Sequence, residues 1–196
     1  MAFESKIKTI EWTGNVSRMV DQTIVPYEYK FIDIKTGQEM YDAIQNMIVR
    51  GAPAIGVSGA QGVALYAFEI QKENLSREEF VSKLVERAHY LASSRPTAVN
   101  LQWAVDKQIE VINKSTSDVA GIVKELIENG IKLQEEDIEI NKRMGDFGAE
   151  IVPKSATILT HCNAGALATV GYGTALGVVR SAYAKDNTIQ VLLMKH

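Results

Sequence analysis

The strongest candidate for chemistry is Cys162, which is the only cysteine in the chain. A β-favouring apolar run, Ala156 to Thr160, precedes it, and Asn163-Ala164-Gly165 and further small residues follow it. This order predicts a strand, a turn and the start of a helix, which is where open α/β sheets bind ligands. A buried cysteine is also an ordinary small hydrophobic residue. The position therefore leaves both a catalytic and a structural Cys162 open.

Two arginines stand at rigid turns, Arg50 before Gly51-Ala52-Pro53 and Arg95 before Pro96. A guanidinium group matches the geometry of phosphate oxygens, so two such turns together predict an anionic ligand. Arg50 alone could equally be a solvated residue that complements a helix dipole. The glycines near Gly51 and after Gly165 match neither the P-loop nor the dinucleotide fingerprint, which argues against NAD.

The sequence predicts no metal site. A single cysteine excludes a cysteine-based zinc cluster, and neither His89 nor His196 has a second ligand at metal spacing. The acidic run Glu135-Glu136-Asp137 is predicted to be a solvated helix face.

Composition limits the class of protein. The chain has 196 residues, is 46% hydrophobic and 23% charged, and has a net charge of -3. These values are typical of one large globular domain or two small ones, and the negative charge argues against nucleic acid as a partner. The first residues lack the apolar core of a signal peptide, and no run of about 18 apolar residues occurs. We expect a cytoplasmic protein with no membrane contact.

Periodicity predicts the elements. Residues 1–36, including Ile7, Ile10, Trp12 and the run Thr23 to Ile34, read as a small β-meander. Helices are expected at 38–49, 54–70, 76–92, 101–113, 118–148 and 165–184, with Gly130 as a weak point of the fifth. The helix at 54–70 is rich in small residues, so it either packs closely on neighbours or presents its backbone to a ligand.

These elements predict an α/β fold in two parts. Residues 1–130 form a β-meander with a mainly helical domain. Residues 131–196 form a linking helix and, with strands at 156–160 and 188–193, one parallel βαβ unit that begins a Rossmann-like domain. A two-stranded sheet is rarely stable alone, so this part looks incomplete.

Three motifs carry a resemblance to a known family: VRGAPAIGVSGAQG (49–62), SRPTAVNLQWAVD (94–106) and ILTHCNAGALATVGYGTALGVVRSA (158–182). Together they resemble the methylthioribose-1-phosphate isomerase family, over residues 7 to 191. The wider family includes translation initiation factor 2B regulatory subunits and ribose-1,5-bisphosphate isomerases.

The resemblance implies an isomerase of methionine salvage that converts 5-methylthioribose 1-phosphate, a sugar phosphate, to 5-methylthioribulose 1-phosphate. It implies no metal or organic cofactor, and a homodimer for the full-length protein. Arg50, Gly51, Ala52 and Arg95 would hold the substrate. Cys162 would be one catalytic group, and an aspartate further along the chain would be the other.

The sequence departs from the family at its end. It reads Val191-Leu192-Leu193-Met194-Lys195-His196 where the family has V-F-A-D-E-T-R. With suitably chosen codons, the loss of one nucleotide would convert the family's segment into this one. Our hypothesis is a truncated or frame-shifted product that is inactive alone, since the catalytic aspartate has no match. A non-catalytic regulatory module and a ribose-1,5-bisphosphate isomerase remain the alternatives.

Overall fold

The computed structural model describes residues 8–194, and its N-terminal element is an antiparallel sheet. The sheet has the order β1 (Ile10–Thr13), β2 (Val16–Val20) and β3 (Phe31–Ile34). The predicted meander is confirmed there, whereas Ile7 lies outside the described residues. The run from Thr23 becomes a strand only at Phe31, because the Asp21 carboxylate accepts hydrogen bonds from the Thr23 amide and hydroxyl and turns the chain.

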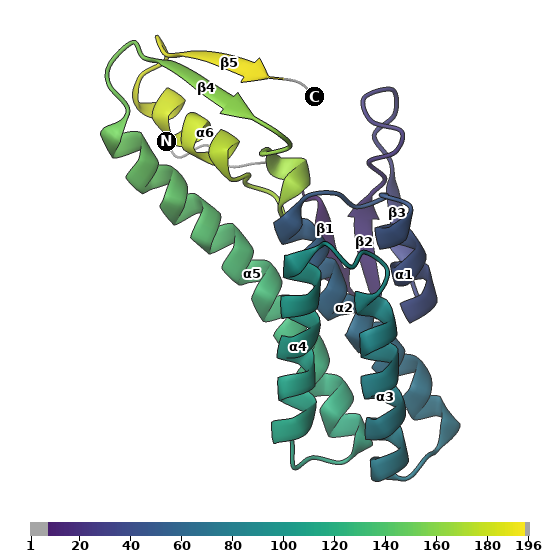
Figure 1. Ribbon diagram of the computed structural model, residues 1–196. Coiled ribbons are helices and arrows are strands. Elements are labelled where there is room, and N and C mark those ends of the chain that lie inside the picture. Colours follow the sequence, from purple (N-terminus) through teal and green to yellow (C-terminus); the bar gives the residue numbers. More distant parts are fainter. Residues whose placement is uncertain (1–7, 195–196) are drawn as a thin grey trace.

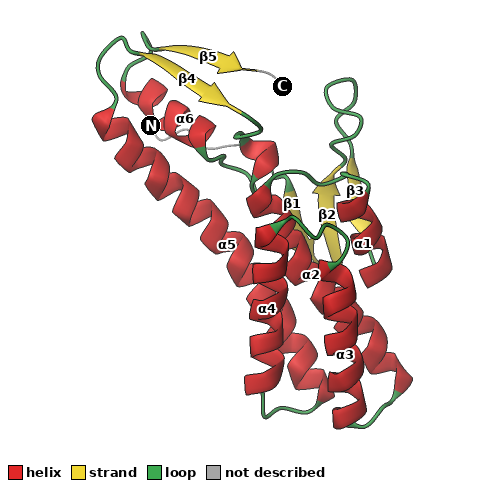
Figure 2. Ribbon diagram, in the orientation of Figure 1, coloured by secondary structure: helices red, strands yellow, loops and turns green. Residues whose placement is uncertain are grey.

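Five helices follow the sheet (Figures 1 and 2): α1 (Gly37–Gln45), α2 (Ala52–Ile70), α3 (Arg77–Ala92), α4 (Val99–Lys114) and α5 (Val119–Ile151). A short 3-10 turn, η1 (Gln71–Glu73), continues α2. The capping box predicted at Ser76 and Glu79 is present, since the Ser76 side chain accepts from the Glu79 amide and the Glu79 carboxylate accepts from the Ser76 amide.

Helix α2 is the centre of the core. Its small residues allow close packing: a methyl group placed on Gly59 would lie 2.6 Å from a Leu101 methyl carbon, and one on Gly62 would lie 2.6 Å from Leu91. Of the two interpretations of this helix, the structure therefore supports close packing on its neighbours.

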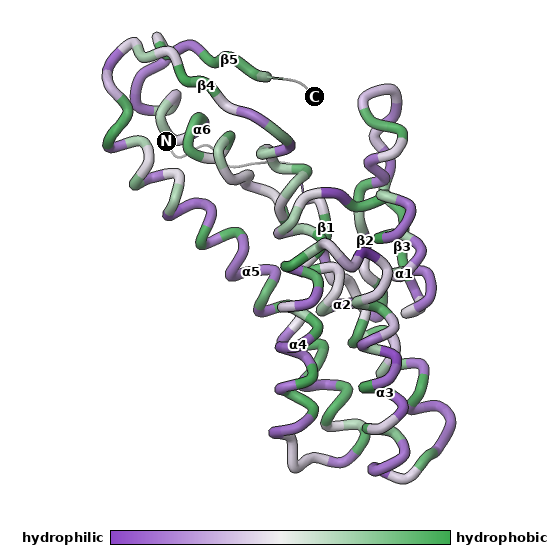
Figure 3. The backbone as a smooth tube through the Cα atoms, viewed as in Figure 1, coloured by the Kyte–Doolittle hydropathy of each residue, from purple (hydrophilic) through white to green (hydrophobic). Residues whose placement is uncertain are grey.

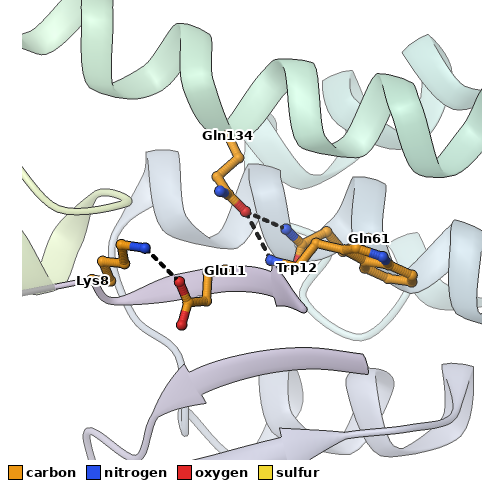
Figure 4. A network of polar contacts seen from close by, with 5 residues as sticks. All are labelled: Lys8, Glu11, Trp12, Gln61 and Gln134. Carbon is orange, nitrogen blue, oxygen red and sulfur yellow. Dashed lines mark hydrogen bonds and ion pairs between the residues drawn. The ribbon is translucent and has the colours of Figure 1, made fainter. Parts of the chain in front are cut away.

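Buried amide side chains fix α5 against α2 and the sheet. The Gln61 side chain accepts a 2.5 Å hydrogen bond from the Ser17 hydroxyl. Its amide group donates to Gln134, whose oxygen also accepts from the Trp12 amide at 2.9 Å (Figure 4). Nearby, the Gln108 side chain donates to the Ala60 and Leu126 carbonyls. Because the side chains of Gln61, Gln108 and Gln134 are paired in this way, these contacts set one position of α5 along α2.

Helix α5 runs without a break through Gly130, so the predicted weak point is wrong. A methyl group on Gly130 would lie 3.6 Å from Gln61, and packing against α2 holds the helix where glycine alone disfavours it. The long α5 then leaves the bundle and carries the C-terminal elements (Figure 1).

The C-terminal elements are β4 (Thr157–His161), η2 (Ala166–Ala168), α6 (Ala175–Lys185) and β5 (Gln190–Met194). Strands β4 and β5 pair in parallel, Thr157 opposite Gln190, which confirms the predicted βαβ unit. The predicted helix from Gly165 is wrong in its start, because residues 169–174 form an irregular loop and α6 begins only at Ala175.

Hydrophobic clusters of very different size stabilise the described chain, and a group of three, Ala60, Ala104 and Leu133, lies between α2, α4 and α5. The large cluster draws on β1 to α5 and includes Val170, whereas the small one has Ala149, Ala182 and Ile189 as its buried members. Leu159 of β4 and Leu193 of β5 remain exposed. Figure 3 shows hydrophobic stretches along both strands. The division at residue 130 stays a prediction. None of the helices in residues 8–194 is long and apolar enough to cross a bilayer.

Candidate functional site

Cys162 directly follows β4 and is exposed. Its φ is +72°, so the chain turns sharply at the end of the strand. The predicted helix start beside the thiol is absent from the structure, since η2 begins at Ala166 and α6 at Ala175. Cys162 therefore stands at the start of the loop of residues 162–174, which is irregular apart from the short 3-10 helix η2.

The 162–174 loop is held by hydrogen bonds to one threonine. The Thr169 hydroxyl accepts from the Gly171 amide at 3.2 Å and from the Gly173 amide at 2.9 Å. Gly173 has a φ of +93°, and a methyl group there would lie 2.9 Å from the Gly165 carbonyl carbon. The Thr174 amide donates to the Ala164 carbonyl at 2.9 Å, which closes the loop two residues after Cys162.

This loop lies directly against the turn that carries Arg50. Gly51 has a φ of +99°, and a methyl group on it would lie 2.3 Å from the Ala168 Cα atom, so glycine is required there. The Gln22 side chain adds a 2.8 Å hydrogen bond to the Leu167 carbonyl, and the Thr9 hydroxyl donates to the Ala166 carbonyl at 2.7 Å. The structure thus brings the predicted Arg50-Gly51-Ala52 turn and the Cys162 loop together.

Arg95 reaches the same end of the molecule through the packing of α4 on α2. It lies half-buried in the turn between α3 and α4, where its carbonyl accepts from the Ala98 amide. At the start of α4, the Asn100 carbonyl oxygen would lie 3.2 Å from a methyl group on Gly56, in the second turn of α2. Figure 1 shows this turn, the start of α2 and the Cys162 loop at one end of the helical bundle.

A cavity of about 310 Å³ opens where these elements meet. Its apolar wall contains Val57, Trp103, Leu133, Ile140 and Met144. Its polar wall contains Asn100, Glu136, Asp137, Asn141 and Thr174. The volume is at the lower end of the range for small-molecule sites, which is about 300–1,000 Å³.

The predicted solvated face at Glu135-Glu136-Asp137 is wrong for Asp137, whose side chain turns inward and is hydrogen-bonded. Its carboxylate accepts a 2.8 Å hydrogen bond from the Val170 amide and a 2.9 Å hydrogen bond from the Asn141 side chain. Burial raises the pKa of Asp137, although these two hydrogen bonds oppose the shift. The signal was available in the sequence, because Asp137 stands four residues from both Leu133 and Asn141, which are buried.

Asn100, Trp103 and Thr174 were also not singled out as site residues, although all three lie within the quoted motifs. Nothing in their local spacing distinguishes them, and only the packing of α4 and the loop against α2 brings them to one cavity. Within residues 8–194, no three His, Cys, Asp or Glu side chains form a group that could hold a metal ion.

Two solved structures share this fold. The 5-methylthioribose 1-phosphate isomerase of Pyrococcus horikoshii superposes with a TM-score of 0.85 and 38% identity, over 96% of this chain and 52% of its own. The delta subunit of translation initiation factor eIF-2B from A. fulgidus superposes with a TM-score of 0.81 and 35% identity, over 97% of this chain and 62% of its own.

Curated relatives point the same way. The chain is 47% identical to the methylthioribose-1-phosphate isomerase of Acetivibrio thermocellus over 94% of this chain and 54% of the relative. It is also 47% identical to that of Trichormus variabilis over 90% of this chain and 51% of the relative. The chain thus spans about half the length of these relatives. Since the model of the initiation factor 2 subunit family matches residues 48–195, three quarters of the sequence, the chain belongs to that family.

Proposed function

We propose that the protein is an aldose–ketose isomerase that converts 5-methylthioribose 1-phosphate to 5-methylthioribulose 1-phosphate. One observation carries the proposal: Gly51, beside the candidate phosphate ligand Arg50, packs on the backbone of the loop that follows the candidate catalytic Cys162. The 47% identity to one isomerase relative and the TM-score of 0.85 to a solved isomerase support the same function.

The reaction sets a specific chemical problem. The anomeric oxygen at C1 carries the phosphate, so the sugar ring cannot open as a free aldose does. The C1–ring oxygen bond must break, hydrogen must move from C2 to C1, and the C2 hydroxyl must lose its proton to become the ketone. The released ring oxygen gains a proton and becomes the C4 hydroxyl, so the overall reaction is an isomerisation. In this proposal Arg50 and Arg95 hold the phosphate oxygens, with Gly51 and Ala52 beside them, and the exposed Cys162 acts at the reacting carbons.

A second candidate function has its own support. The similarity to an eIF-2B delta subunit, with a TM-score of 0.81, favours a regulatory module that binds a sugar phosphate or nucleotide without turnover. Ribose 1,5-bisphosphate isomerisation is a third candidate that uses the same phosphate-binding turns. The isomerases should turn over their substrates in a reaction that depends on Cys162, whereas the regulatory module should bind a ligand without turnover.

The test measures binding and turnover separately. Calorimetric titration of the 196-residue chain with 5-methylthioribose 1-phosphate should show binding that Arg50→Ala and Arg95→Ala each weaken about tenfold or more, since a hydrogen bond to a charged group contributes about 1.5–3 kcal/mol. Arg87→Ala, an exposed arginine of α3, should bind as the wild type does. Ribose 1,5-bisphosphate serves as the competing ligand.

Turnover is followed by ¹³C NMR as a new ketone signal from C2. It is measured on the 196-residue chain and on the product of the complete coding region. In an active form, Cys162→Ala should lower kcat at least about a hundredfold. Ligand binding without turnover in either form would favour the regulatory module, and preferred turnover of ribose 1,5-bisphosphate would favour the third candidate.

The expected cytoplasmic location and the homodimer stay predictions. Sedimentation equilibrium on both forms tests the dimer, and fractionation of the source cells tests the location.

A further inference from the structure

We propose that an apolar row on α5 joins two copies of this chain in an antiparallel pair. The row consists of Ile140, Met144, Phe147 and Ile151, which lie on the half of α5 that extends beyond the helical bundle (Figure 1). The four residues are separate from the candidate phosphate ligands and from Cys162, so the pairing goes beyond the proposed function and can be tested without it.

The spacing of the row places its members on one face of the helix. They follow one another by four, three and four residues, which is the spacing of side chains that stack along one side of an α-helix. In chain order the residues are 59%, 39%, 63% and 83% exposed. Single exposed apolar residues are ordinary on a protein surface, whereas a contiguous exposed row marks an interaction surface.

Helix α6 covers the adjacent side of α5 and leaves the row open. A methyl group on Gly145 would lie 2.7 Å from the Ser181 hydroxyl oxygen, and one on Gly148 would lie 2.5 Å from Val178. A groove of about 660 Å³ follows this edge, lined by the whole row together with Arg143, Gly148 and Val178. The groove is thus apolar along its length, with one charged side chain at its margin.

The charges beside the row favour a second copy as the occupant. Arg143 and Glu150 are exposed two helical turns apart on the same edge of the row, and neither forms an ion pair within residues 8–194. In an antiparallel pair centred between Met144 and Phe147, Met144 of each copy faces Phe147 of the other. Arg143 of one copy then lies about 3 Å along the helix axis from Glu150 of the second copy.

Symmetry makes this arrangement self-complementary. A twofold axis perpendicular to the two helices keeps the charged edges on the same side, so both pairs of Arg143 with Glu150 form at once. A parallel pair would bring the charged edge against the side of the other α5 that α6 covers, and both charges would stay unpaired. The antiparallel direction is therefore the one that the charges favour.

Sedimentation equilibrium of the 196-residue chain, from about 1 to about 500 µM, tests the pairing. The wild type should dimerise within this range, because a contact over about three helical turns is smaller than a standard interface. Phe147→Ser and Ile151→Ser should each raise the dissociation constant at least about tenfold, since each change acts twice in a twofold pair. Tyr27→Ser removes another exposed aromatic side chain and should leave the dissociation constant unchanged.

Charge reversal tests the direction of the pair. Arg143→Glu and Glu150→Arg should each raise the dissociation constant about fivefold, and the double variant should return it to within about twofold of the wild type. Lys142→Glu, a reversal at an exposed position on the other side of α5, is the matched control and should have no effect. Circular dichroism verifies that each variant is folded, and the exposed charge variants retain the test where an apolar variant is not.

Three results would overturn the proposal. A wild type that stays monomeric at every concentration would favour a covering segment in the product of the complete coding region. A dimer that Phe147→Ser and Ile151→Ser leave unchanged would place the contact elsewhere on the molecule. A double charge variant that dimerises no better than the single ones would contradict the antiparallel arrangement.

Discussion

At the scale of single residues, Gly51 links the candidate phosphate turn to the candidate catalytic loop. Gly51→Ala combines a left-handed φ of +99° with a methyl group 2.3 Å from backbone of Ala168. The strain in φ alone costs about 1–2 kcal/mol, and displacement of the loop adds to it. We expect a loss of at least about 3 kcal/mol in unfolding free energy, measured by urea denaturation.

Gly14→Ala is the matched control for this change. Gly14 also has a positive φ, +60°, but a methyl group there would have nothing within 4 Å. It should therefore lose only the conformational contribution of about 1–2 kcal/mol. Equal losses in the two variants would contradict the contact between Gly51 and the loop.

Tyr66 supplies a second test at this scale. Its side chain is buried, and its hydroxyl lacks a hydrogen-bond partner within residues 8–194. Tyr66→Phe should therefore raise the unfolding free energy by up to about 1 kcal/mol, because it removes an unsatisfied polar group. Tyr172→Phe is the opposite case, since the Tyr172 hydroxyl lies 2.7 Å from the Ser181 hydroxyl, and it should lose about 1 kcal/mol.

The stability of the protein at alkaline pH gives a second test of the buried Tyr66 hydroxyl. Burial raises the pKa of Tyr66 to about 12 in the folded state, whereas an exposed tyrosine in the unfolded chain titrates near 10. The unfolded state therefore loses its proton first, and stability falls between about pH 10 and pH 12. Urea midpoints across this range should fall less steeply for Tyr66→Phe than for the wild type.

At the scale of elements, α5 positions the Cys162 loop through one carboxylate. Asp137→Ala removes the acceptor of the Val170 amide, whose hydrogen bond is 2.8 Å long. Exchange of the Val170 amide with solvent should accelerate at least about tenfold, because a hydrogen bond to a charged group contributes about 1.5–3 kcal/mol. Asp137→Asn, which retains an acceptor oxygen, should show a smaller change, and amides of α3 should show none.

The starts of β4 and β5 are joined by another carboxylate. The Thr188 hydroxyl and the Ser155 and Thr188 amides donate to Asp186 and lower its pKa to about 2. Since the pKa is depressed on folding, this contribution is present above about pH 4 and is lost as the pH falls from 4 to 2. The difference in urea midpoint between the wild type and Asp186→Asn should shrink across that window; a constant difference would refute it.

At the scale of the whole molecule, the features that could be predicted from the sequence are those that depend on residues close together in the chain. The capping box of Ser76 and Glu79, the Gly51-Ala52-Pro53 start of α2 and the parallel pairing of β4 and β5 all follow from nearby residues. The loop after Gly165 could not be predicted, because Thr169 and the distant Thr9, Gln22 and Asp137 hold it out of helical form. The unbroken helix at Gly130 also depends on distant residues, because contacts with α2 outweigh the low helix propensity of glycine.

The unequal hydrophobic clusters also predict how the whole molecule opens. The small cluster of Ala149, Ala182 and Ile189 supports β4, α6 and β5, whereas most buried residues of α2 belong to the large one. Native-state hydrogen exchange should therefore show amides of β4 and β5 opening with protection at least about a hundredfold lower than amides of α2. Along α5, protection should be high near Leu126 and lower beyond Gly145.

This profile tests the predicted division near residue 130, because a single cooperative unit would protect both ends of α5 equally. Val170 belongs to the large cluster, so its amide should exchange with the N-terminal part and not with β4. The Cys162 loop would then be held at its far end by the stable core and at its near end by the less stable strand. A conformational opening of β4 would move the thiol relative to the Arg50 turn while Gly51 and Ala168 stay in contact.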